Sequence, residues 1–291
     1  MRIQLLSDLH LETHAEVPIQ PAPGAEVLVL AGDIGSYQTG SRLTEPDFGL
    51  SRFSPLRPGS PWRKVFFVPG NHEYDGLDFD TTPTRLQALC AELGIVWLER
   101  AVHVDGDVRF VGTTLWSDFD ALAEPGDDTT HLLRKRDKAF RAANFYLRKN
   151  STLQSGVPML AEDLRELGLR CQSWLRLALD APFEGRTVVV SHFAPSLFSA
   201  DPRYGLTPGT AGFCNSLDDL LGQADLWMHG HLHCPADYTV RSPTGRACRV
   251  VANPLGYARK GEQAGFRLAW SVSLPGAGRE PVAPVTGTCL S

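Results

Sequence analysis

Residues 1–10 read MRIQLLSDLH, a short apolar run that ends at Asp8 and His10. The pattern returns in residues 27–33, VLVLAGD, where an aliphatic run ends at a glycine and an aspartate. Short runs rich in Val and Leu that stop at Gly or Asp are typical of buried strands. On this basis the sequence predicts strands at residues 3–7, 27–31, 65–68, 108–113, 187–191 and 226–228.

Longer segments between these runs have helical periodicity. Apolar residues recur three and four positions apart in residues 84–93 and 159–179, and residues 131–147 form a third predicted helix that is rich in Lys and Arg. Strands that alternate with helices indicate an α/β protein. We expect one domain over residues 1–275, with a long irregular loop at 35–62, a candidate cap at 117–158, a last strand at 266–274 and a poorly ordered tail at 276–291.

Composition excludes several classes of protein. The 291 residues are 43% hydrophobic and 21% charged, which is too apolar for a disordered chain. A net charge of −5 provides no general attraction to polymeric nucleic acid or to an anionic membrane. No apolar run approaches the ~20 residues of a membrane span, and residues 1–7 lack the pattern of a signal peptide. The six cysteines form no CxxC pair, so we expect a cytoplasmic protein without a thiolate metal site.

Metal-binding residue types follow five of the predicted strands. Ligands of open α/β sheets bind beyond the carboxyl ends of the strands, so we expect these residues to converge. The set comprises Asp8, His10, Asp33, Asn71, His192, His231 and His233. Two carboxylates, one amide oxygen and four imidazoles suit divalent ions such as Mn, Fe or Zn. Seven ligands are too many for one four-coordinate ion but fit two ions that share a carboxylate.

Each of these residues also has an ordinary structural interpretation. A single Asp or Asn after a strand is usually a turn or cap residue, and only the ordered set favours metal binding. We interpret His229 as a structural residue at a strand end. Glu73 is expected to orient a neighbouring imidazole or to serve the fold, and Asn253 to form a turn. His14 and the other remaining histidines belong to no motif.

Five motifs in a fixed order resemble the calcineurin-like metallophosphoesterase superfamily. They are Asp8-Leu9-His10, Gly32-Asp33, Gly70-Asn71-His72-Glu73, His192 and Gly230-His231-Leu232-His233. Each motif alone is weak, but the complete ordered set is highly specific and spans most of the chain. The resemblance implies a four-layer αββα sandwich, in which two mixed β-sheets pack face to face and helices flank them.

The resemblance also implies a role for each motif residue. Asp8, His10 and His233 would hold one metal, Asn71, His192 and His231 the second, and Asp33 would bridge the two. His72 would be the general acid. A water shared by two cations loses a proton near neutral pH and can attack phosphorus, while an imidazolium protonates the leaving alkoxide.

Differences between these motifs and those of better-known branches of the superfamily narrow the range of expected reactions. Ile34-Gly35 follows Gly32-Asp33, without the nearby Asp-Arg-Gly of protein Ser/Thr phosphatases. The third motif reads Gly-Asn-His, whereas lipid-A pathway pyrophosphatases have Gly-Asn-Arg. Class III cyclic-nucleotide phosphodiesterases and many bacterial phosphodiesterases are more similar, so we expect a phosphodiesterase that acts on a small phosphoester. A phosphomonoesterase, a nuclease of the same fold and a non-catalytic scaffold remain alternatives, and the natural substrate and oligomeric state stay open.

Overall fold

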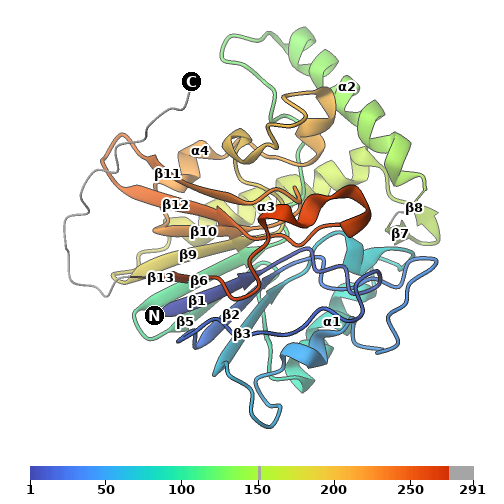
Figure 1. Ribbon diagram of the computed structural model, residues 1–291. Helices are drawn as coiled ribbons and strands as arrows, with labels where there is room; N and C mark the ends of the chain where they lie inside the picture. Colours follow the sequence, from blue (N-terminus) through green and yellow to red (C-terminus); the bar gives the residue numbers. More distant parts are fainter. Residues whose placement is uncertain (150–151, 275–291) are drawn as a thin grey trace.

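Two mixed β-sheets form the centre of the computed structural model, which describes residues 1–149 and 152–274 (Figure 1). The predicted tail, 276–291, lies outside the described residues. The first sheet has the order β13 (Ser271–Ser273), β1 (Arg2–Leu6), β2 (Val27–Ala31), β3 (Lys64–Val68) and β4 (Val96–Trp97). The second has the order β11 (Ala236–Arg241), β12 (Ala247–Ala252), β10 (Leu226–His229), β9 (Arg186–Ser191), β6 (Val108–Thr113) and β5 (Ala101–Asp105). Antiparallel edge strands flank parallel central strands, namely β13 in the first sheet and β11 and β5 in the second.

Alternating side chains of the central strands build two hydrophobic layers. Ile3 and Leu5 of β1 belong to the cluster between the two sheets, whereas Leu6 belongs to the cluster beneath the helices. This is the period of two that a strand imposes when both faces are covered. Phe66 of the first sheet stacks on Phe110 of the second, with ring centroids 4.1 Å apart, and joins the sheets face to face.

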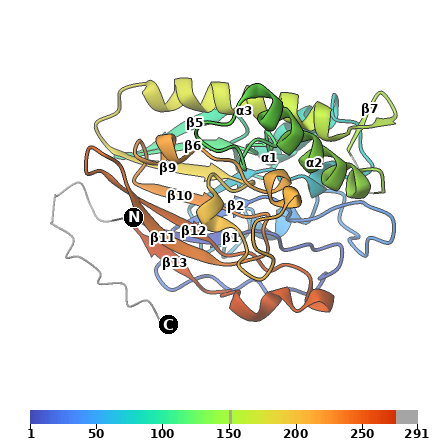
Figure 2. The ribbon, with the colours of Figure 1, turned by 90° about the horizontal axis from the view of Figure 1, so that it is seen from above.

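Helices cover the outer faces of both sheets. α1 (Thr82–Glu92) packs on the first sheet beside β4, and α3 (Ala161–Asp180) packs on β6 of the second. α2 (Thr129–Leu147) lies beside α3 and against the 3-10 helix η4 (Pro208–Gly212) (Figure 2). The remaining helices are α4 (Asp218–Leu221), η1 (Leu50–Phe53), η2 (His72–Tyr74), η3 (Leu197–Ser199), η5 (Ala258–Lys260) and η6 (Glu262–Gly265). The predicted α/β sandwich of two mixed sheets is therefore confirmed.

The described strands and helices match most of the sequence predictions. The six predicted strands and three predicted helices are present, with ends that differ by a few residues. The strand predicted at 266–274 is wrong in its first half, because residues 266–270 form no strand and only Ser271–Ser273 pair with β1. The 117–158 segment contains α2 and a hairpin of β7 (Leu153–Gln154) and β8 (Val157–Pro158). Within 1–149 and 152–274, no helix is long and apolar enough to cross a membrane, and the five cysteines form no disulfide.

Candidate metal centre

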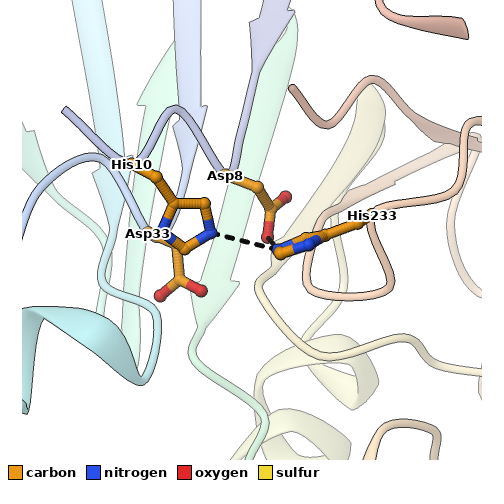
Figure 3. Close-up of side chains that lie close together, drawn as sticks. All are labelled: Asp8, His10, Asp33 and His233. Carbon is orange, nitrogen blue, oxygen red and sulfur yellow. Dashed lines mark hydrogen bonds and ion pairs between the residues drawn. The ribbon is translucent and has the colours of Figure 1, made fainter. Parts of the chain in front are cut away.

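All seven predicted ligands meet at one edge of the sandwich, beyond the carboxyl ends of β1, β2, β3, β9 and β10. One group contains Asp8, His10, Asp33 and His233, and a second contains Asp33, His192 and His231. In each group one candidate ligand atom per residue lies within 4.8 Å of the others. Figure 3 shows the first group, in which His10 Nε2 lies 3.1 Å from His233 Nε2. The Oδ1 atom of Asn71 lies 3.2 Å from His192 Nε2, so Asn71 adjoins the second group.

Left-handed backbone conformations accompany these side chains. Positive φ angles occur at Asp8 (52°), His10 (46°), Asp33 (55°), His231 (70°) and His233 (50°). Non-glycine residues rarely adopt such angles, and the cost is tolerated mainly at functional sites. The motif glycines leave room for the carboxylates. A Cβ on Gly230 would lie 2.5 Å from Asp8 Oδ2, and the amide of His231 instead approaches that carboxylate to donate hydrogen bonds of 2.9 and 3.1 Å.

Acceptors behind the histidines orient three of the imidazoles. Glu12 Oε1 lies 2.9 Å from His10 Nδ1, and Glu262 Oε2 lies 2.6 Å from His233 Nδ1. The carbonyl oxygen of Ala31 lies 2.8 Å from Nδ1 of His192. Such partners fix the ring and leave Nε2 free to coordinate, as is usual around protein metals. Sequence reasoning missed Glu12 and Glu262.

Unpaired buried atoms and two neutral imidazoles make this donor set suitable for cations. Among the described residues, Asp33 Oδ2 and His231 Nε2 are buried without a hydrogen-bond partner. Burial lowers the pKa of His10 and of His231 well below the usual value, so their nitrogen lone pairs are available. Burial alone would raise the pKa of Asp33, but the imidazoles of His192 and His72 outweigh it and keep the carboxyl ionised. The seven residues therefore fit a pair of divalent transition-metal ions.

His72 begins η2 and lies beside both metal groups. Its Nε2 atom is 4.0 Å from Asp33 Oδ2, and its Nδ1 atom is 2.5 Å from Asp75 Oδ2. Burial alone would lower the pKa of His72, but the carboxylates of Asp33 and Asp75 raise it to about 10. The two carboxylates therefore favour the protonated ring, whose Nε2 atom is turned toward the cluster. Asp75 was not predicted, although its position three residues after His72 is a local signal.

The residues expected to be structural have other partners. Glu73 orients backbone rather than an imidazole, because its carboxylate accepts the N–H groups of Asp33 at 3.0 Å and Gly70 at 2.6 Å. Nε2 of His229 lies 2.9 Å from Ser199 Oγ, a partner suited to a structural role. The side chain of Asn253 bonds to backbone groups of Leu5 and Arg267. His14, His103 and His131 belong to neither metal group.

An aromatic residue that sequence reasoning missed packs over the first group. Tyr257 is 8% exposed, and its ring stacks on His10 with centroids 4.1 Å apart at an interplanar angle of 25°. It also meets the rings of His233 and His72 in edge contacts at 5.2 and 6.4 Å. The sequence predicts only a turn at Asn253, and no motif marks the tyrosine.

The chain is similar to several known proteins. The uncharacterized protein L509 of Acanthamoeba polyphaga mimivirus is 23% identical over 251 residues, which cover 80% of this chain and 79% of that protein. The solved phosphopantetheinyl hydrolase of Mycobacterium tuberculosis has the same fold, with a TM-score of 0.67 and 21% identity over 96% of this chain and 98% of its own. A dimetal phosphatase from Danio rerio is 14% identical, with a TM-score of 0.41 over 87% of this chain and 86% of its own. A family model for calcineurin-like phosphoesterases matches residues 1–235, and the chain therefore belongs to the calcineurin-like phosphoesterase family.

Proposed function

We propose that the protein is a metal-dependent phosphodiesterase that acts on small phosphodiesters. The observation that carries phosphoester hydrolysis is the arrangement of His72, whose Nδ1 atom is paired with Asp75 while Nε2 faces the shared Asp33 carboxylate. The choice of a diester rests on the resemblance of the Gly70-Asn71-His72-Glu73 motif to phosphodiesterase branches of the family. A poor alkoxide leaving group needs a proton as the ester bond breaks, and a protonated imidazole at the edge of the metal site can provide it.

The proposed roles follow from the two groups of ligands. Asp8, His10 and His233 would hold one cation, Asn71, His192 and His231 would hold the second, and Asp33, which belongs to both groups, would serve both. When bound, the cation pair supplies charge neutralisation at the phosphoryl oxygens and a hydroxide nucleophile at neutral pH.

The surrounding side chains align the reacting groups. Glu12 and Glu262 keep the Nε2 atoms of their histidines directed at the cations. Asp75 accepts a hydrogen bond from the Nδ1–H group of His72 and holds the ring in position. His72 can then transfer the proton on Nε2 to the departing oxygen. Proton transfer of this kind contributes typically about 100- to 10,000-fold to the rate.

The substrate class is tested with the full chain loaded separately with Mn²⁺, Fe²⁺, Co²⁺ and Zn²⁺. Bis(p-nitrophenyl) phosphate and p-nitrophenyl phosphate are compared first, followed by cyclic nucleotides, dinucleotides, phospholipid-derived diesters and duplex DNA. A structural relative is named a phosphopantetheinyl hydrolase, so a phosphopantetheine diester belongs in the panel. We expect kcat/KM to be at least tenfold higher for a small diester than for its monoester. A preference for the monoester or for DNA would favour those alternatives, and no turnover with any metal would favour a scaffold.

A further inference from the structure

An exposed aromatic side chain borders the second metal group. Phe213 directly follows η4 and is 44% exposed. Its ring centroid lies 5.2 Å from that of His231, with an interplanar angle of 37°. The buried ring of Phe193 lies 3.9 Å from the same imidazole, centroid to centroid. Among the exposed aromatic side chains of residues 1–149 and 152–274, Phe213 alone pairs with the ring of a predicted metal ligand.

A short strand pairing accounts for the common position of the two phenylalanines. Ala194 and Cys214 form a parallel bridge, and the N–H of Asn215 donates to the carbonyl oxygen of Ala194 at 2.9 Å. Phe193 and Phe213 each precede a residue of this bridge, so their side chains lie on the same face of the pairing. With His231 they form one cluster of rings that is buried at Phe193 and exposed at Phe213.

The backbone on both sides of Phe213 is fixed by hydrogen bonds. Before it, Ser117 Oγ donates to the carbonyl oxygen of Ala211. After it, Asn215 Nδ2 donates to the carbonyl oxygen of Leu115 at 3.1 Å. A single exposed apolar side chain is common and needs no explanation by itself. An aromatic ring that an anchored backbone holds against a metal ligand differs from that case, because its exposed face is preorganised for a ligand.

Phe213 and the general acid border different metal groups. Nε2 of His231 is buried without a hydrogen-bond partner among the described residues and is available to the second cation. A phosphoryl group bound to that cation would lie beside the imidazole that Phe213 contacts. The ring of His72 instead meets those of His10 and Tyr257, at 5.0 and 6.4 Å, beside the first group. Since the general acid serves the leaving oxygen, Phe213 is placed for the other ester group, which stays on phosphorus.

We propose that Phe213 is a specificity residue whose exposed face stacks on a planar aromatic ring in the retained ester group of the substrate. The inference rests on the proposed phosphodiesterase function, because only a diester keeps an ester group on phosphorus, and it narrows the substrate to a diester with an aryl group or a nucleobase there. Both kinds of ring offer a π-face that stacks on a phenylalanine.

The test varies the retained group and keeps 4-nitrophenolate as the leaving group. The measured quantity is the ratio of kcat/KM for phenyl 4-nitrophenyl phosphate to that for methyl 4-nitrophenyl phosphate, with the manganese-loaded full chain. In Phe213→Leu we expect this ratio to fall about 3- to 10-fold, as for the loss of an aromatic pair, and in Phe213→Tyr to stay within about twofold. A thymidine 4-nitrophenyl phosphodiester, compared with its base-free deoxyribose analogue, forms a second pair. A larger fall for this pair identifies a nucleobase, and a larger fall for the phenyl pair identifies an aryl group.

A control and two further measurements make the result specific. Phe198→Leu removes a ring that is 72% exposed in the same connection between β9 and β10 but that meets Tyr238, so it should keep the wild-type ratio. Calorimetry gives the Kd of phenylphosphonate and of cyclohexylphosphonate, which has a similar size but no aromatic face. The preference for phenylphosphonate should fall in Phe213→Leu alone, while metal content by mass spectrometry stays at the wild-type level.

Three results would overturn the assignment. Phe213→Leu could keep both preferences, it could slow the phenyl and methyl diesters equally, or it could lose the second metal, which would make the ring a support for His231. A different outcome is a wild-type protein that turns over no diester with any metal although its preference for phenylphosphonate depends on Phe213. That result would remove the phosphodiesterase function itself.

Discussion

The Oδ1 atom of Asp33 accepts a hydrogen bond from the backbone N–H of His72 at 2.8 Å. Oδ2 of the same carboxylate lies 3.2 Å from His192 Nε2 and is buried without a hydrogen-bond partner among the described residues. One oxygen therefore positions the first residue of η2, while the other is available to cations. This arrangement couples the spacing of the two metal groups to the position of His72.

Asp33→Asn should separate these two tasks. The amide oxygen can still accept the His72 N–H, but the loss of the charge shared by both groups should reduce bound metal from two ions to one or none. Because the metals supply several kcal/mol of transition-state stabilisation, turnover should fall by about 1,000-fold or more. Metal content measured by mass spectrometry checks this, with Asp107→Asn at an exposed turn as the control. Two tightly bound ions in the variant would contradict the bridging role.

His72→Ala should leave both metals bound and still slow the reaction. The imidazole is placed beside the cluster and is not required as a ligand, so metal content should stay at the wild-type level. The rate should fall by about 100- to 10,000-fold for alkyl leaving groups and much less for nitrophenolate, which departs without a proton. A series of diesters with graded leaving-group pKa values measures this dependence. An equal loss across the series would mean that His72 acts in binding.

Asp75→Asn tests the positioning of the same ring through its pH profile. Asp33 and Asp75 together raise the pKa of His72 to about 10, so removing the Asp75 charge should lower it. A general acid works in its protonated form, and the alkaline limb of kcat should therefore move to lower pH, by about one unit or more. The KM should change little at pH 6. An unshifted limb with a lower kcat at every pH would indicate a structural role only.

The positions of the metal ligands could be predicted from the sequence because they depend on a local rule. Asp8 and Asp33 directly follow apolar runs, and the ends of neighbouring parallel strands meet at one edge of a sheet. The edge strands lack the apolar run that marks the central strands. β5 and β11 alternate half-buried and exposed residues, and β4 has only two residues, so their pairing depends on the strand beside them.

The acidic residues that hold the histidines differ in how easily they could be predicted from the sequence. Glu12 and Asp75 lie two and three residues after the histidines that they hold, so a search for acids near each motif would find them. Glu262 has no such neighbour, since it lies 29 residues after His233, and it also accepts a hydrogen bond from the N–H of Tyr257. Only the packing of the segment after β12 brings Tyr257 and Glu262 to the metal groups.

Glu262→Gln should weaken one metal and spare the other. Oε2 of Glu262 accepts a hydrogen bond from Nδ1 of His233 at 2.6 Å. Loss of such a partner typically costs about 10- to 100-fold in metal affinity. The second group contains neither residue, so its affinity should be unchanged. Competition with a chromogenic chelator measures the two affinities, and Glu184→Gln at an exposed position serves as the control. Equal weakening of both metals would point to a general loss of structure.

Replacement of Tyr257 should distinguish the stacking of its ring from any role of its hydroxyl. Tyr257→Phe keeps the face that lies 4.1 Å from His10, whereas Tyr257→Leu removes it. An aromatic pair contributes about 0.5–1.5 kcal/mol beyond its buried area, so the leucine variant should bind the first metal up to about tenfold more weakly. The phenylalanine variant should stay within about twofold of wild type, because the ring face is retained. If phenylalanine weakened the metal as much as leucine, the hydroxyl rather than the stacked ring would be holding the imidazole in place.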